Sequence, residues 1–305
     1  MTTTQTDRTA QTDASRPGTS VVVTGAAVLL PGADTVRALA DGPAAGGAPV
    51  EPAAHVGKKG LRYKDRATQL GYALTAAALR DAGLLGADEK DGLSVPATSV
   101  GVVASSNFGN LDTVARALDT LREETVTGTS PMDLPNASSN VIASSAAIRY
   151  GLRGPNLMVC NGETSGLDAV HWAATMISAG RTERVLVLGV EPDNEVVRKL
   201  LDGEHAVDGG AALVVESRTA AAERSATVRA VLGPYSRGAG EVDLRGRRWQ
   251  APAHLGKASG ASGLLQIAAA VGWFDAGERG PVQAVTGTAA DDASADLLLL
   301  APEAA

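Results

Sequence analysis

Four runs of apolar, mostly β-branched residues constrain the fold of this chain more than any other feature of its sequence. They cover residues 20–25, 99–104, 185–190 and 211–216. The last two are almost continuously apolar, which is typical of strands that are covered on both faces of a sheet. Helical patterns lie between the runs, at about 64–82, 111–123, 137–150 and 167–179. Alternating strands and helices predict an α/β fold, with helices layered on a largely buried, mixed sheet.

The pattern restarts after residue 225 in a shorter form. It has a predicted strand at 227–232, a helix at about 260–275 and strands at 282–285 and 297–300. We therefore divide the chain into a first half, residues 20–225, and an abbreviated second half, residues 226–305. The polar residues 1–19 are predicted to be a disordered tail. Residues 40–60 are predicted to be a loop, and residues 156–160 a short buried strand.

Composition excludes several classes of function. The chain has 34 acidic and 27 basic residues, a formal net charge of −7 and a pI near 5.2, which argues against nucleic acid or an anionic membrane as the main partner. No apolar run approaches the roughly 20 residues of a membrane span. The N-terminus lacks the pattern of a secretory signal. A single cysteine and four scattered histidines show no ligand spacing, so we expect a cytoplasmic protein without cofactor or metal.

Six segments, in this order along the chain, resemble the β-ketoacyl synthases, the elongating ketosynthases of the thiolase superfamily. They are VVVTGAAVLLPGADTVRALADG, DRATQLGYALTAAALRDAGL, PMDLPNASSNVIASSAAIRYGLRGPN, NGETSGLDAVHWAATMISAGRTERVLVLGVE, DGGAALVVES and GKASGASGLLQIAAAV. The resemblance implies a thiolase-like fold of α-β-α-β-α layers. Its first half is expected to be complete and its second half abbreviated.

The family's nucleophile position departs from the pattern of the condensing members. Their turn reads roughly Thr-Ala-Cys-Ala-Ser-Gly, and the cysteine thiolate at a helix N-terminus takes the acyl chain. Here the turn is Asn-Gly-Glu-Thr-Ser-Gly at 161–166, which places Glu163 at the nucleophile position. A carboxylate is a poor acyl acceptor, because the anhydride it would form is less stable than the thioester.

The two catalytic histidines of the family are also missing. The second belongs to Gly-His-x-x-Gly-Ala-x-Gly, and the matching segment 256–263 has Lys257 in its place. Lysine is a cation on a flexible stem and cannot present a neutral imidazole near pH 7. The chain has no His-Gly-Thr-Gly-Thr motif for the first histidine. Residues 285–292 replace the glycine-rich gate near the end of the family's sequence. We therefore expect no condensation activity.

The resemblance favours a non-catalytic partner subunit. Type II polyketide systems pair an active ketosynthase with a homologous chain-length factor that lacks the cysteine and typically carries Gln there, a residue nearly isosteric with Glu163. The pair forms a heterodimer through strands beside the nucleophile turn, here the region 150–165, and acts on chains bound to an acyl carrier protein. The residues expected to line the acyl tunnel are Phe108, Leu111, Val114, Leu118, Met132 and Leu134.

Two other functions remain open at this point. The first is an enzyme that decarboxylates, hydrolyses or cyclises a carrier-bound substrate through Glu163 and Lys257, since a Glu–Lys pair can do acid–base work when burial tunes both pKa values. The second is a structural homodimer. Glu163 itself is either a functional carboxylate or a residue that fills the old site. Lys257 is either its ion-pair partner or a solvated loop residue.

The remaining candidates have simpler interpretations. Cys160 lies in the apolar strand, three residues before the nucleophile position, and is predicted to be a buried, inert thiol. His171 and His254 are predicted to be packed or surface histidines and not general bases. The basic segment Arg245–Trp249 is either a docking patch for an acidic acyl carrier protein or a solvated loop.

Overall fold

The computed structural model describes residues 20–87, 92–130, 134–239, 242–288 and 290–303. The predicted tail, residues 1–19, lies outside them. The strands are β1 (Val21–Leu29), β2 (Val100–Ser105), β3 (Asn156–Val159), β4 (Arg184–Glu191), β5 (Gly209–Ser217), β6 (Ala230–Gly238), β7 (Val282–Thr286) and β8 (Ser294–Leu300). The four apolar runs are strands β1, β2, β4 and β5, so this prediction is confirmed.

The long helices lie where the sequence predicts them. The α-helices are α1 (Val36–Asp41), α2 (Pro52–Val56), α3 (Arg66–Asp81), α4 (Leu111–Glu124), α5 (Val141–Tyr150), α6 (Ser165–Ser178), α7 (Glu195–Leu200), α8 (Arg218–Glu223) and α9 (Ser262–Asp275). Short 3₁₀ turns are η2 (Ala97–Ser99), η3 (Val126–Gly128), η4 (Leu134–Ala137), η5 (Ala253–Leu255) and η6 (Ser259–Ala261). The segment 40–60 is not wholly a loop, because Pro52 starts the short helix α2 at a position that tolerates proline.

The strands form one mixed sheet in the order β3-β2-β4-β5-β1-β6-β8-β7. β2, β3 and β4 are parallel, while β5 is antiparallel to β4 and β1. β1 and β6 pair only through Val22 and Val23, so the sheet is nearly divided between them. Each part repeats one arrangement, in which a central strand (β5 or β8) is antiparallel to both of its neighbours.

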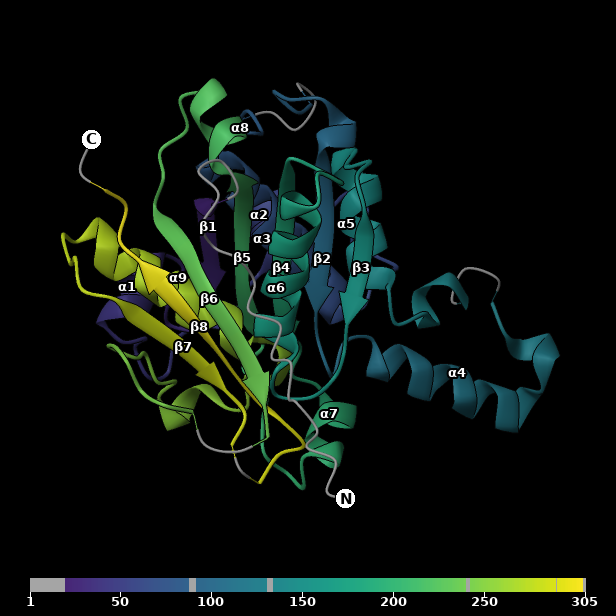
Figure 1. Ribbon diagram of the computed structural model, residues 1–305. Helices are drawn as coiled ribbons and strands as arrows, with labels where there is room; N and C mark the ends of the chain where they lie inside the picture. The colour runs from purple at the N-terminus through teal and green to yellow at the C-terminus, as the bar shows by residue number, and fades with distance from the viewer. Residues whose placement is uncertain (1–19, 88–91, 131–133, 240–241, 289, 304–305) are drawn as a thin grey trace, which may run out of the picture.

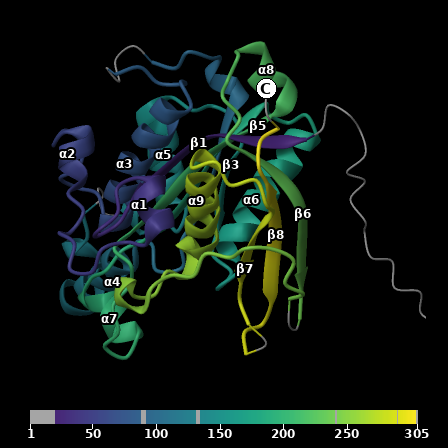
Figure 2. The same ribbon diagram turned by 90° about the vertical axis from the view of Figure 1, so that its left-hand side faces the viewer.

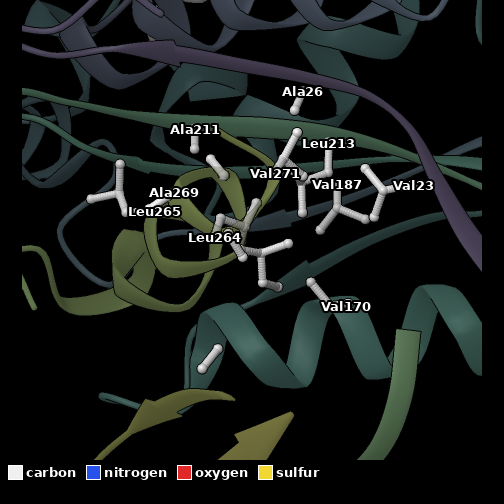
Figure 3. Packing of buried hydrophobic residues seen from close by; sticks show 14 of the residues in the cluster. Val23, Ala26, Val170, Val187, Ala211, Leu213, Leu264, Leu265, Ala269 and Val271 are labelled. Atoms are coloured by element: carbon white, nitrogen blue, oxygen red, sulfur yellow. The ribbon is translucent and has the colours of Figure 1, made fainter. Parts of the chain in front are cut away.

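Helices α6 and α9 lie between the two parts of the sheet, and α3 and α5 cover the far face of the first part (Figure 1). The main apolar core surrounds the two central helices. Within it, Leu264 and Val271 of α9 pack near Leu213 of β5 (Figure 3). A second core lies under α3, where Leu70, Leu74 and Leu79 are fully buried. This α/β layering agrees with the predicted fold class.

Helices α6 and α9 cross at two glycines, because a larger residue at either position would clash with the backbone of the other segment. A Cβ atom on Gly166 of α6 would lie 2.8 Å from the carbonyl oxygen of Gly260, and one on Gly263 of α9 would lie 2.8 Å from the amide nitrogen of Leu167. Real Cβ atoms do not come so close to backbone. The two glycines therefore bring the N-terminal ends of α6 and α9 together, which matters for the site described below.

The second part of the sheet is covered on one face only. Its outer face, on β6, β8 and β7, carries no helix of the described residues (Figure 2). The predicted outermost helix layer is thus missing from the part of the chain that the structure describes, because the only long helix after β6 is α9 and it is used in the central layer. The predicted boundary at residue 225 falls between α8 and β6.

One predicted strand has a different environment from the one we expected. Among the strands that the structure describes, β3 is at the edge of the sheet and pairs with β2 alone, and Leu157 in it is 39% exposed. The prediction of a buried strand is wrong, since short apolar runs look alike whether or not a neighbouring strand covers them. No helix in the described ranges is long and apolar enough to span a membrane.

Candidate active site

The candidate site lies at the carboxyl ends of the parallel strands β3, β2 and β4. Parallel strands bring these ends to one edge of a sheet, which is where ligand sites form in open α/β sheets. β3 leads into the turn at 160–164, β2 into Ser106 and Asn107, and β4 ends on Glu191. The second half adds the loop 256–261, which precedes α9.

The turn that carries Glu163 is held by its own hydrogen bonds. The amide of Asn161 donates to the Ser165 hydroxyl at 2.8 Å, and that hydroxyl lies 2.7 Å from the carbonyl oxygen of Gly162. Gly162 has φ of +88°, which favours glycine. Glu163 lies two residues before Ser165, the first residue of α6. The unpaired backbone amides at the start of a helix favour an anion there.

Asn107 connects the turn to both halves of the chain. Its amide nitrogen donates to the carbonyl oxygen of Gly162 and to the Ser259 hydroxyl, each at 2.8 Å. Its side-chain oxygen lies 3.0 Å from the Ser165 hydroxyl and accepts from the amide of Gly162 at 3.2 Å. The sequence-based reasoning missed this residue. The signal available was a polar side chain three residues after the end of the apolar run 99–104.

Glu163 is half-buried, and burial raises the pKa of its carboxyl above the ordinary value. The positive charge of Lys257 and a hydrogen bond with Ser259 lower that pKa, while the charge of Asp291 raises it. The structure thus brings Glu163 and Lys257 into one site, as the resemblance implied. Among the residues it describes, however, no salt bridge joins them, and Lys257 is exposed.

The loop that carries Lys257 is fixed by its backbone. The amide of Lys257 donates to the carbonyl oxygen of His205 at 2.9 Å, and its own carbonyl accepts from Val207 at 3.1 Å. Two residues later, Ser259 has φ of +37°, an unusual conformation for a residue other than glycine. Strained backbone of this kind often accompanies functional sites.

Glu191 lies behind the turn and is fully buried. Its two carboxylate oxygens accept from the amides of Asn107 (2.8 Å), Phe108 (3.0 Å) and Gly260 (2.9 Å) and from the Ser106 hydroxyl (2.9 Å). These four bonds lower its pKa, but burial outweighs them and raises the pKa to about 7. We did not predict this residue from the sequence, although a carboxylate directly after a continuous apolar strand is unusual.

Cys160 is exposed, so the prediction of a buried thiol is wrong. It follows the edge strand β3, beyond which the described residues form no further strand. Partial burial and the charge of Glu191 both raise the pKa of its thiol. The thiol is accessible, and among the described residues no charge or hydrogen bond that would lower its pKa acts on it.

The predicted tunnel residues fall into two groups. Phe108 is buried with Val197 and Ala206, and Leu111 packs against them. Val114 is half-buried, whereas Leu118 and Leu134 are 56% and 60% exposed. Met132 lies outside the described residues. Leu118 lines an open groove of about 730 Å³ between α4 and α7. The five of these residues that the structure describes do not gather around one tunnel, and the role of all six in an assembly stays a prediction.

The other candidates have structural surroundings. His171 is half-buried and stacks on the Tyr235 ring, and burial lowers its pKa. His254 is exposed, next to His205. In the basic segment 245–249, Trp249 is buried and Arg247 stacks on Trp273 and pairs with Glu278. This segment is therefore only partly available as a cationic patch.

Comparisons with known proteins agree with this geometry. Residues 51–197 match the family model of the beta-ketoacyl synthase, N-terminal domain, a range that includes β2, β3, β4 and the Glu163 turn. Over these residues the chain is similar to the beta-ketoacyl synthases. The match covers the edge of the first half at which the site lies, and the turn with Glu163 falls inside the matched range.

Curated relatives match over part of their length. The 3-oxoacyl-[acyl-carrier-protein] synthase 2 of Vibrio harveyi is 34% identical over 137 residues, which is 45% of this chain and 32% of that protein. The enzyme of the same name from Vibrio cholerae serotype O1 is 32% identical over 137 residues, again 45% and 32%. The matched segment thus spans about a third of the length of these relatives.

Solved structures share the ketosynthase fold over nearly the whole chain. The ishigamide ketosynthase/chain length factor superposes with a TM-score of 0.72 at 19% identity, covering 92% of this chain and 99% of that one. A type II PKS acyl-carrier protein in complex with its ketosynthase, AntDE:AntF, gives 0.72 at 15% identity, covering 93% and 99%. At these identities the likeness shows the fold alone.

Proposed function

We propose that this ketosynthase-like chain is a non-condensing subunit that pairs with an active ketosynthase, in the manner of a chain-length factor of polyketide biosynthesis. The observation that carries the proposal is the Glu163 turn. Hydrogen bonds through Asn107 and Ser165 hold the turn at the start of α6, and the side chain that it carries there is a carboxylate and not a thiol. An ordered turn without a reactive thiol supports a role in assembly.

The edge strand β3 supports a role in assembly. Strand edges present unpaired backbone groups, and soluble proteins cover or block long apolar ones. Large exposed apolar side chains lie on β3 and on the two helices that contact it: Ile148 of α5, Leu157 of β3 and Trp172 of α6. A partner with the same fold can pair its own edge strand with β3 and cover this surface.

An acyl carrier protein is the second proposed partner. These carriers are acidic, and a chain with a net charge of −7 needs a local cationic surface to dock one. Arg62, Lys64, Arg66 and Arg116 line one surface cavity of about 440 Å³. Arg66 is already paired with Asp208, and the Lys64 ammonium group bonds to Asn136 and Ser145, which leaves Arg62 and Arg116 as the better candidates. This surface fits a carrier better than the segment 245–249 does.

The alternative of a Glu163–Lys257 enzyme has weaker support. Burial raises the pKa of Glu163, as acid–base work near neutral pH requires. The exposed Lys257 forms no salt bridge with it among the described residues, so the two groups are not held in a defined geometry. The proposed partner subunit therefore remains our conclusion, and the same experiment separates it from this enzyme and from a structural homodimer.

Co-expression with an active β-ketoacyl synthase of the same organism tests the proposal. Size-exclusion chromatography with light scattering should give a 1:1 complex, and this chain alone should elongate no carrier-bound acyl chain. Leu157→Arg should abolish the complex, because it puts charges into the strand interface. Leu244→Arg is the matched control, since Leu244 is 57% exposed in a loop that lies far along the chain from β3. A stable self-dimer that ignores the ketosynthase, or turnover by this chain alone, would refute the proposal.

A further inference from the structure

Glu191 joins three segments that are far apart in the sequence. It ends β4, and its carboxylate accepts from the loop after β2 and from the loop before α9. The sequence separations of these bonds are 85, 84 and 69 residues. Glu191 is therefore the one described residue whose side chain binds the backbone of both halves beside the candidate site.

The two loops that Glu191 holds also hold Glu163. Asn107 donates its amide to Glu191 and uses its side chain to bind Gly162 and Ser259. Gly260, which donates its amide to Glu191, follows Ser259 directly, and Ser259 is a hydrogen-bond partner of the Glu163 carboxyl. A displacement of Glu191 would therefore move both loops and with them the groups that contact Glu163.

We infer that Glu191 is the positioning residue of this site, and that its protonation controls whether the loops of the two halves stay docked around Glu163. Each of its oxygens accepts from two donors: Oε1 from the amides of Asn107 and Gly260, and Oε2 from the Ser106 hydroxyl and the amide of Phe108. The inference rests on this geometry and stands apart from the proposed partner role.

The donors explain how the residue can respond to a proton. Three of them are backbone amides, which only donate, whereas the Ser106 hydroxyl can either donate or accept. When Glu191 is ionised, all four can donate to it. When it is protonated, its O–H can turn to Ser106 Oγ, which already accepts from the amide of Gly109 at 2.8 Å. Ser106 is thus the group that lets either form of Glu191 fit the site.

The surroundings of Glu191 hold few other titratable groups. Cys160, at the end of β3, faces it closely enough for the charge of Glu191 to raise the thiol pKa. The loop at 106–108 and the residues Ser259 and Gly260 contribute no ionisable side chain. Glu163 and Lys257 lie in the same site, but the shift of Glu191 arises from burial and from its four hydrogen bonds. Its titration is therefore governed by whether the loops exclude water.

The direction of the effect follows from linkage. In the docked state burial raises the pKa of Glu191 to about 7 from an ordinary value of 4.5. The docked state then holds the proton more tightly than a state in which the loops have opened to water. Docking is favoured at low pH and weakens as the pH rises through 7. Opening should become roughly 70-fold more frequent between pH 5 and pH 8.

Amide hydrogen exchange on the isolated protein measures this opening directly. The probes are the amides of Asn107, Phe108 and Gly260, with rates corrected for the intrinsic effect of pH. We expect faster corrected exchange at pH 8 than at pH 5 in the wild type, and no such difference in E191Q. Asp65→Asn is the matched control, because Asp65 is another buried carboxyl with a raised pKa and contacts neither loop. D65N should keep the wild-type behaviour.

Two results would overturn the inference: corrected exchange that is flat with pH in the wild type, or an unchanged pH dependence in E191Q. If E191Q does not fold, the pH dependence of exchange in the wild type and in D65N still tests the inference. The three probe amides must then respond to pH more strongly than the amide of Val102, which bonds to Pro155 inside the sheet. No partner protein is present in this experiment, so its outcome does not depend on the proposed assembly.

Discussion

Two fully buried glutamates stand at opposite ends of the β4–β5 ladder, and they are bound in different ways. Glu216 is paired with Arg184 and Arg224 and accepts from Thr24. Glu191 accepts only from neutral donors. Buried charges are ordinarily paired with opposite charges. The difference shows that one end of the sheet is closed by an ion cluster, while the other keeps a carboxyl free to titrate where the candidate site is built.

The largest effect is expected at the ion cluster. Glu216→Ala leaves the 4% exposed Arg184 without its main partner, and breaking a buried pair costs about 3–5 kcal/mol. Chemical denaturation should show this loss at every pH between 5 and 8. If the free energy of unfolding fell by less than about 1 kcal/mol, the ion pairs of Glu216 would contribute little to stability, and this difference between the two glutamates would disappear.

Glu191 should instead give a pH-dependent stability. Its pKa is raised in the folded state, so its contribution is fully present below the ordinary value of 4.5 and is lost as the pH rises through about 7. The full difference amounts to about 3 kcal/mol. E191Q should flatten the dependence of the unfolding free energy on pH over this range. Glu216→Gln should lower the curve and leave its slope in place.

Asn107→Ala sharpens the comparison within the site. It removes the side chain that bonds Gly162, Ser165 and Ser259, and each lost bond to a partly buried partner costs about 1 kcal/mol. The global unfolding free energy should fall by about 2–3 kcal/mol, because three partners each lose a bond. The rate of amide hydrogen exchange should rise much more at Gly162 than at the amides of β5. Equal changes in both places would show that the turn does not depend on Asn107.

The smallest effect concerns Cys160. Because the charge of Glu191 raises the thiol pKa, E191Q should increase the rate of iodoacetamide alkylation at pH 7.5 by a few-fold. Glu216→Gln should not change the rate, since Glu216 acts on the other end of the sheet. Equal alkylation rates in the wild type and E191Q would show that the charge of Glu191 does not affect the pKa of the Cys160 thiol.

The sequence alone determined the first half of the fold and the identity of the key turn. β1, α3, β2, α6, β4 and β5 all lie within a few residues of their predicted places, because hydrophobic periodicity is a local property. The motif at 161–166 located Glu163, and the motif at 256–263 placed Lys257 in the same site. Both rested on the resemblance to ketosynthases.

Only the tertiary structure decided the surroundings of these residues. The exposure of Cys160 and Leu157 depends on β3 being an edge strand, which strand pairing sets and residue type does not. Glu191, Asn107 and Gly260 meet across 69 to 84 residues of chain, so no local pattern could join them. The physical reason is the same in each case. Periodicity tells which side of an element is apolar, whereas burial, hydrogen bonding and pKa depend on which distant segment the fold places against it.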